Sequence, residues 1–157
     1  MGSRSFHDIR VLFDLKSPAR DGVILSTDVF LPKSGGPFPV VLLRTPYDSL
    51  RSVHIDWACW WARRGYACAI QENRGRFKSE GTFYSYHDDG RDGHDCLEWI
   101  ANQPWCNGKI GMSGRSYGGI VQWQAARYRS KHLTAIAPQV IMSDYFGDCL
   151  YHGAGNR

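Results

Sequence analysis

The first third of the chain has the hydrophobic pattern of β-strands. Apolar residues dominate positions 9–15 and 23–31, and Asp21-Gly22 between them is a pair typical of the tight turn in a β-hairpin. A loop rich in Gly and Pro follows, and residues 40–43 then form a continuous apolar run. Such a run is typical of a strand that is buried on both faces. We therefore expect an antiparallel hairpin followed by a central buried strand.

The hydrophobic period changes after this strand. Trp57, Trp60 and Trp61 follow the i, i+3, i+4 spacing of a helix, so we expect a helix that buries one aromatic face and ends near Gly65. Residues 71–90 are rich in Gly, Arg and Ser and are expected to form a long loop. The same criteria predict strands at 66–70, 109–113 and 133–137, a helix that begins at Asp92 and ends near Asn102, and a helix over 120–126.

This alternation of strands and helices after an antiparallel start predicts the fold class. We expect an α/β fold with a mostly parallel sheet and helices on both of its faces. The chain has 157 residues, of which 43% are hydrophobic, and it shows no internal repeat or interdomain linker. That length and composition are enough for one domain with a substantial core.

Charge and cysteine usage narrow the class of protein. The 19 basic and 15 acidic residues give a net charge of +4 and are scattered along the chain, which argues against binding to nucleic acid or to a membrane surface. No apolar run is long enough to cross a bilayer, and the N-terminus lacks the apolar centre of a signal peptide. The five cysteines show no Cys-x-x-Cys spacing, so we expect reduced, buried thiols in a cytoplasmic protein.

One motif points to a chemistry. Gly114-Arg115-Ser116-Tyr117-Gly118 is a Gly-x-Ser-x-Gly sequence between a predicted strand and a predicted helix. In that context Ser116 is a candidate nucleophile at a sharp, strained corner, and the flanking glycines are needed because a side chain would collide where strand and helix nearly touch. The backbone N–H of Tyr117 is then placed to stabilise an oxyanion. A second donor could be the hydroxyl of Tyr47, after the third strand, although Tyr47 could equally be a packed surface aromatic.

A serine nucleophile needs a base and an acid, and the chain offers no convincing pair. Downstream of Ser116 the histidines are His132 and His152, and the acids are Asp144 and Asp148. His132 comes too soon after the predicted helix, and His152 lies in a Gly-rich tail, so helix capping or solvent exposure explains both better.

Two further stretches resemble ligand sites only superficially. The acids and histidines of residues 87–95 match no calcium or zinc spacing, and we interpret them as acids at a helix N-terminus, where the helix dipole favours them. Arg74-Gly75-Arg76 does not form a phosphate-binding pattern. These arginines are expected to be solvated or ion-paired.

The chain resembles the family of α/β-hydrolases that contains cocaine esterase, X-prolyl dipeptidyl-peptidases and α-amino-acid ester hydrolases. The resemblance covers nearly the whole chain. The motifs that carry it are Arg20-Asp21-Gly22-Val23, Asp28-Val29-Phe30-Leu31-Pro32, Arg44-Thr45-Pro46-Tyr47, Gly65-Tyr66-Ala67, Arg74-Gly75-Arg76 with Ser79-Glu80-Gly81, Glu98-Trp99-Ile100, Gln103-Pro104-Trp105-Cys106-Asn107-Gly108 and Gly111-Met112-Ser113-Gly114-Arg115-Ser116-Tyr117-Gly118-Gly119.

The resemblance implies roles for three residues. Ser116 would be the acyl-forming nucleophile, Tyr47 the side-chain oxyanion donor and Tyr117 the backbone donor. It implies a small-molecule ester or peptide-like substrate and no metal or organic cofactor. Esterase, dipeptidyl-peptidase and acyl-transfer activities all stay open. Asn73 departs from the family pattern, which usually has Asp before this Arg-Gly, so the contact that fixes this loop is in question.

The resemblance also implies an incomplete enzyme. Family members are several times longer, and they carry the acid and the histidine on late strands, a helical cap and a C-terminal jelly-roll domain. We therefore expect residues 1–157 to form the N-terminal part of the catalytic domain, truncated after about the sixth strand of the sheet. The alternative is a catalytically silent fragment or half of a split enzyme, which would associate with itself or with a complementing chain.

Overall fold

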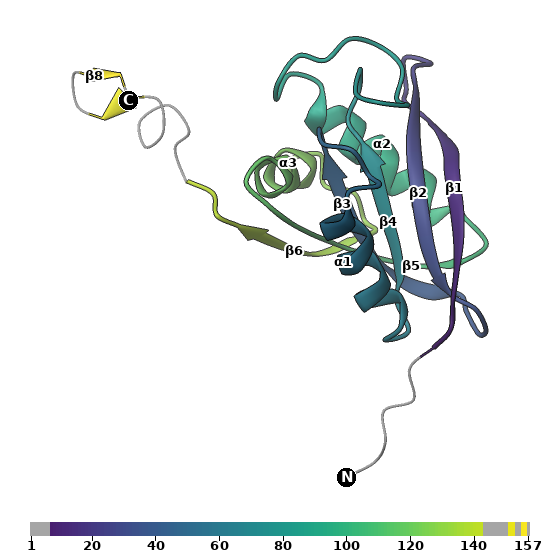
Figure 1. Ribbon diagram of the computed structural model, residues 1–157. Helices are drawn as coiled ribbons and strands as arrows, with labels where there is room; N and C mark the ends of the chain where they lie inside the picture. The colour runs from purple at the N-terminus through teal and green to yellow at the C-terminus, as the bar shows by residue number, and fades with distance from the viewer. Residues whose placement is uncertain (1–6, 143–150, 153–154, 157) are drawn as a thin grey trace.

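The computed structural model describes residues 7–142 and the backbone of residues 151–152 and 155–156. A six-stranded sheet with the order β1-β2-β4-β3-β5-β6 forms its centre (Figure 1). Its strands are β1 (Ile9–Pro18), β2 (Ile24–Pro32), β3 (Phe38–Thr45), β4 (Ala67–Glu72), β5 (Cys106–Arg115) and β6 (Leu133–Gln139). A separate pair, β7 (Tyr151–His152) and β8 (Gly155–Asn156), was not predicted from the sequence. No described helix is long and apolar enough to cross a membrane.

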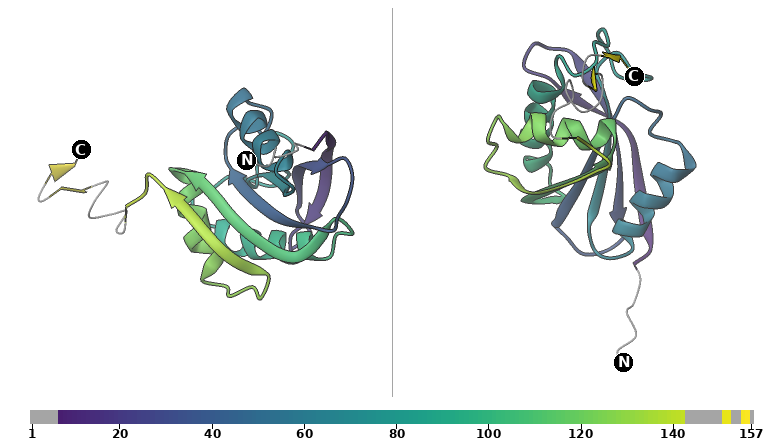
Figure 2. Two further views of the ribbon diagram at one scale, coloured as in Figure 1. Left: turned by 90° about the horizontal axis from the view of Figure 1, so that it is seen from below. Right: turned by 90° about the vertical axis from the view of Figure 1, so that its left-hand side faces the viewer.

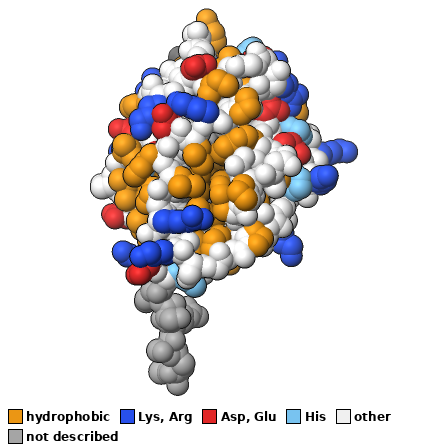
Figure 3. Space-filling view, turned by 90° about the vertical axis from the view of Figure 1, so that its right-hand side faces the viewer, with side chains coloured by type: hydrophobic (Ala, Val, Ile, Leu, Met, Phe, Trp, Pro, Cys, Tyr) orange, Lys and Arg blue, Asp and Glu red, His pale blue; other side chains and the backbone are white. Residues whose placement is uncertain are grey.

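The predicted hairpin is confirmed. β1 and β2 pair antiparallel, and the register of Pro18 opposite Ile24 encloses the turn that contains Asp21-Gly22. Gly22 has φ +86°, a backbone conformation that glycine adopts without steric cost. Edge strand β1 is exposed on the side of the molecule shown in Figure 3, where hydrophobic side chains lie among basic ones.

The predicted parallel part of the sheet is also confirmed. β3 pairs parallel with β4 on one side and with β5 on the other, and β6 pairs parallel with β5. The carboxyl ends of these four strands therefore meet at one edge of the sheet. The loop after β3 and the loop after β5 are neighbours there, because β3 and β5 are adjacent strands.

Helices cover both faces of the sheet (Figures 1 and 2). α1 (Ser52–Ala62) lies on one face, and α2 (Asp89–Ala101) and α3 (Tyr117–Ala126) lie together on the other. The strands β2, β3 and β4 contribute to both cores: Leu42 faces α2 and α3, whereas Leu43 faces α1. This is why the strand residues at 40–43 are apolar without alternation.

The prediction that α1 buries an aromatic face is confirmed in part, because Trp57 and Trp61 pack against the core whereas Trp60 does not. The buried residues of α1 are Ala58 and Ala62, because small side chains let the helix approach the sheet closely. Trp57 and Trp61 are half-buried at the margin of this core, and Trp60 is 48% exposed. The Arg64 guanidinium lies 3.7 Å from the centre of the Trp60 ring and covers it.

Candidate active site

A sharp corner joins β5 to α3. β5 ends at Arg115 and α3 begins at Tyr117, so Ser116 alone makes the turn. Its backbone has φ 51° and ψ −120°, which is strained for a residue with a side chain and costs about 1–3 kcal/mol. The Ser116 N–H donates to Gln139 O at 2.9 Å, and its carbonyl accepts from the N–H groups of Gly119 and Ile120. The side chain stays exposed at the carboxyl edge of the sheet.

The glycines around Ser116 are required by close approach. A Cβ on Gly114 would lie 2.8 Å from Leu43 Cδ1 and 2.9 Å from Gly118 O. A Cβ on Gly119 would overlap the side chain of Ile141 and lie 3.0 Å from Gln139 O. These separations are shorter than real Cβ contacts, so the predicted steric role of the motif is confirmed for its first glycine.

Tyr117 presents its backbone and hides its side chain. It is the first residue of α3, and within the described residues nothing accepts a hydrogen bond from its N–H. The ring is 7% exposed and stacks on Tyr86 with 4.3 Å between ring centres. The hydroxyl donates to Asp89 Oδ2 at 2.6 Å. Burial and then the hydrogen bond to Asp89 raise the pKa of Tyr117 well above its ordinary value.

Tyr47 lies on the loop after β3, at the same edge of the sheet as Ser116. The parallel register pairs Leu42 with Met112, so the ends of β3 and β5 lie level with each other. The Tyr47 side chain is 44% exposed, and its hydroxyl has no hydrogen-bond partner among the described residues. The Arg51 guanidinium lies 5.5 Å from the centre of its ring.

Comparison with known proteins identifies the family of this chain. Residues 21–156 match the sequence profile of the X-Pro dipeptidyl-peptidase (S15 family). The chain belongs to this family. It is 44% identical to cocaine esterase from Rhodococcus sp. over 138 residues, which are 82% of this chain and 23% of that protein. A putative serine esterase of Mycobacterium bovis is 27% identical over 161 residues, covering 85% of this chain and 25% of that protein.

Solved structures of hydrolases share the fold. A CocE/NonD family hydrolase from Staphylococcus aureus superposes with a TM-score of 0.75 at 28% identity, covering 82% of this chain and 27% of that one. An α-amino acid ester hydrolase superposes with a TM-score of 0.74 at 29% identity, covering 92% of this chain and 28% of that one. The chain thus spans about a quarter of the length of these S15-family relatives, and the expected α/β-hydrolase fold is confirmed.

Three contacts that sequence reasoning missed hold the Tyr47 loop. The Ser49 hydroxyl lies 2.7 Å from Asp28 Oδ2 and 2.9 Å from Glu72 Oε1, and all three residues are buried. Arg76 Nε donates to Pro46 O at 2.9 Å, directly before Tyr47. No local pattern marks Ser49, because its two partners come from β2 and β4.

Asn73 stands where the family pattern usually has an aspartate, and it still makes contacts that fix the start of its loop. Asn73 Nδ2 donates to Asp89 Oδ1 at 2.7 Å, and its backbone N–H donates to Thr45 O at 2.9 Å. The amide therefore holds the start of this loop against α2 and β3. The loop stays anchored although the usual aspartate is absent.

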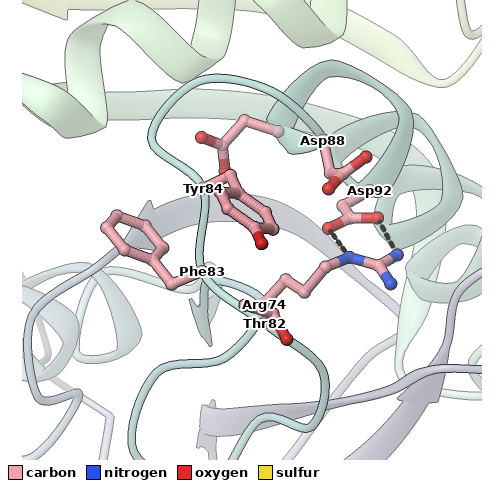
Figure 4. A pocket seen from close by; sticks show the side chains of 7 residues that line it. Arg74, Thr82, Phe83, Tyr84, Asp88 and Asp92 are labelled. Atoms are coloured by element: carbon pink, nitrogen blue, oxygen red, sulfur yellow. Dashed lines mark hydrogen bonds and ion pairs between the residues drawn. The ribbon is translucent and has the colours of Figure 1, made fainter.

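The acids of this segment lie at a helix N-terminus, as predicted, but α2 begins at Asp89 rather than at Asp92, so the predicted loop is shorter than expected. Asp89 and Asp92 are in the first turn of the helix and are 4% and 2% exposed. Arg74 forms two hydrogen bonds to Asp92, at 3.0 and 2.6 Å, across a small pocket beside the helix (Figure 4). Arg74 is thus ion-paired, as expected. In the described part of the chain no group of three or more His, Cys, Asp or Glu could hold a metal ion.

His132 is placed away from a base role on Ser116. His132 precedes β6 at the opposite edge of the sheet, about 20 Å along the strand direction from Ser116. Its Nδ1 lies 3.1 Å from Gly108 O. This histidine therefore neither caps a helix nor is fully exposed, contrary to both expectations. The side chain of His152, and Asp144 and Asp148, lie outside the described residues. No described residue hydrogen-bonds to the Ser116 hydroxyl.

Proposed function

We propose that this chain carries the nucleophile and the oxyanion donors of a serine hydrolase that cleaves ester or amide bonds. Membership of the S15 family and similarity to esterases support the hydrolase class. The single observation that supports Ser116 as nucleophile is its strained backbone at an exposed corner, because such strain persists where function needs it.

In the proposed reaction the Ser116 Oγ attacks the carbonyl carbon of the substrate. The Oγ–H proton passes to a histidine of the complete enzyme, and the carbonyl oxygen becomes an oxyanion. The Tyr47 hydroxyl and the Tyr117 N–H would donate to this oxyanion, each contributing about 3 kcal/mol. The intermediate collapses to an acyl-enzyme as the protonated leaving group departs, and water then releases the acyl group. No step requires a metal or an organic cofactor.

The substrate class follows from the relatives and stays broad. Cocaine esterase and α-amino acid ester hydrolase are named for ester cleavage, and the family profile is named for X-Pro dipeptide release. We therefore propose a small ester or a peptide-like substrate, and an esterase or a dipeptidyl-peptidase activity. The free Cys59, Cys68, Cys96 and Cys106 support a reducing, cytoplasmic location.

A fluorophosphonate probe tests the nucleophile directly, because it modifies only an activated serine. In the complete enzyme, which supplies the histidine, we expect one adduct on Ser116, located by peptide mass spectrometry, and none in Ser116→Ala. Ser113→Ala is the matched control, since Ser113 is a buried serine on β5, the strand that leads to Ser116. With p-nitrophenyl acetate as substrate, Tyr47→Phe is expected to lower kcat about a hundredfold. A folded chain that reacts equally with and without Ser116 would refute the proposal.

The second candidate is an association module. β6 is an edge strand of the sheet, and exposed residues on and after it include Ala135, Ala137 and Val140, the last 68% exposed. An unpaired apolar edge favours pairing with another strand. Light scattering after size exclusion tests this candidate: a dimer that is broken by Ala135→Lys would support it, and a monomer at high concentration would not.

A further inference from the structure

We propose that Asp89 is a positioning residue for the corner at Ser116. Its buried carboxylate holds the phenol of Tyr117, and through it the first turn of α3, so that the Tyr117 N–H points at the oxyanion. The inference rests on the proposed function, in which this N–H is one of the two donors. Asp89 itself does not reach the substrate, because the Tyr117 ring it binds is directed into the protein.

The Tyr117 side chain is held on several sides. Its hydroxyl donates to Asp89 Oδ2 at 2.6 Å and accepts from the Tyr86 N–H at 3.0 Å. The same Tyr86 N–H is 3.2 Å from Asp89 Oδ2, so the three groups form a closed triangle. One face of the ring stacks on Tyr86 with 20° between ring planes, and Phe83 lies 6.0 Å away.

Asp89 is in turn bound to the sheet. Its Oδ1 accepts from Asn73 Nδ2 at 2.7 Å and lies 3.7 Å from Arg44 Nη1. The same Nη1 donates to the Asp89 carbonyl oxygen at 2.6 Å. Arg44 is fully buried on β3, and its Nε donates to Gln71 at 2.7 Å. The position of the Tyr117 hydroxyl is therefore set by β3 and β4, the strands on which the Tyr47 loop also depends.

At the corner, Ser116 itself is restrained, within the described residues, only through its backbone hydrogen bonds to Gln139, Gly119 and Ile120, so a side-chain anchor on the next residue adds to its stiffness. Ser116 is in a strained conformation, and the next residues of the turn, Gly118 and Gly119, are the most permissive in backbone torsion. Tyr117 is the one residue of this first turn with a large side chain. Fixing its hydroxyl adds a second restraint, besides the hydrogen bonds that the Ser116 carbonyl accepts, on the peptide plane that carries the Tyr117 N–H donor.

Two variants test the anchor. Tyr117→Phe removes only the hydroxyl, and Asp89→Asn keeps the size of the side chain but removes its charge and one acceptor. With the fluorophosphonate probe we expect each to lower the maximal labelling rate of Ser116 about tenfold, with the half-saturating probe concentration unchanged. The double variant should be no slower than the slower single variant, because both act through one hydrogen bond.

Tyr84→Phe is the matched control. Tyr84 lies in the same loop region, is 66% exposed, and its hydroxyl has no hydrogen-bond partner among the described residues. It should label at the wild-type rate. Ile100→Val controls for general loss of stability, since Ile100 is a fully buried core residue of α2. If Ile100→Val slows labelling as much as Tyr117→Phe does, the inference is overturned.

Amide hydrogen exchange tests whether Asp89 and Tyr117 restrain the corner, and it does so without relying on catalysis. We expect faster exchange in the peptide that spans residues 114–119 for Tyr117→Phe and Asp89→Asn, and no change for Tyr84→Phe. Unchanged exchange in Tyr117→Phe overturns the positioning role, whatever the activity. If the complete wild-type enzyme is not labelled at Ser116 but its corner loosens in both variants, the proposed function is refuted and the anchor is supported.

Discussion

Ser49→Ala should destabilise the protein far more than the removal of one oxygen atom suggests. The two carboxylate oxygens that contact the Ser49 hydroxyl, Asp28 Oδ2 at 2.7 Å and Glu72 Oε1 at 2.9 Å, are no more than about 5.6 Å apart. All three residues are buried. The hydroxyl hydrogen is the donor between the two acids, and a hydrogen bond to a charged group contributes about 1.5–3 kcal/mol.

The expected cost of this change is about 1–3 kcal/mol, because the alanine methyl group removes the donor that the two buried carboxyl oxygens share. Unfolding in urea, followed by tryptophan fluorescence, measures the loss as a lower midpoint with an unchanged slope. Ser34→Ala is the matched control, because Ser34 is exposed and has no side-chain hydrogen bond within the described residues.

A second substitution tests the reasoning itself. In Asp28→Asn the amide Nδ2 can donate to Glu72, while its oxygen still accepts from the Asp14 N–H as Asp28 Oδ1 now does at 2.8 Å. Asp28→Asn combined with Ser49→Ala should therefore be at least about 1 kcal/mol more stable than Ser49→Ala alone. A Ser49→Ala variant as stable as Ser34→Ala, or a double variant that adds the two costs, would refute the account.

Three further predictions concern sterics, protonation and thiol reactivity. Gly114→Ala should lower the unfolding free energy by about 1–3 kcal/mol in urea, whereas Gly111→Ala, whose added Cβ would meet nothing closer than 3.8 Å, should cost less. Burial lowers the pKa of His54 below its ordinary 6.5, so the folded state binds fewer protons than the unfolded state. Stability should therefore fall as the pH drops from 6.5 through the folded pKa, and His54→Gln should flatten this slope; an unchanged slope contradicts it. Burial raises the pKa of Cys96 to about 12, so a thiol reagent at pH 8 should modify half-buried Cys59 first and Cys96 only on unfolding, as peptide mass spectrometry would show.

Much of the fold was predictable because its signals are local. The turn pair Asp21-Gly22 and the apolar run at 40–43 depend on backbone torsion and on burial of both faces, which a short stretch of sequence expresses directly. The corner at Ser116 belongs to the same class, because the need for Gly114 arises within one strand–turn–helix unit. The face of α1 was not predictable in this way. Its partner is a sheet surface whose shape decides that Ala58, rather than Trp60, fits against it.

The sequence by itself determined the order of the elements, the hairpin, the parallel sheet and the sharp turn at Ser116, since each follows from residues that are neighbours in the chain. Only the tertiary structure decided how that turn is supported. Asp89 meets Tyr117 across 28 positions, and Ser49 meets Asp28 across 21, through pairings of strands and helices that carry no short-range pattern. A buried polar side chain must find its partner wherever the fold brings one, so its role becomes visible only when the chain is folded.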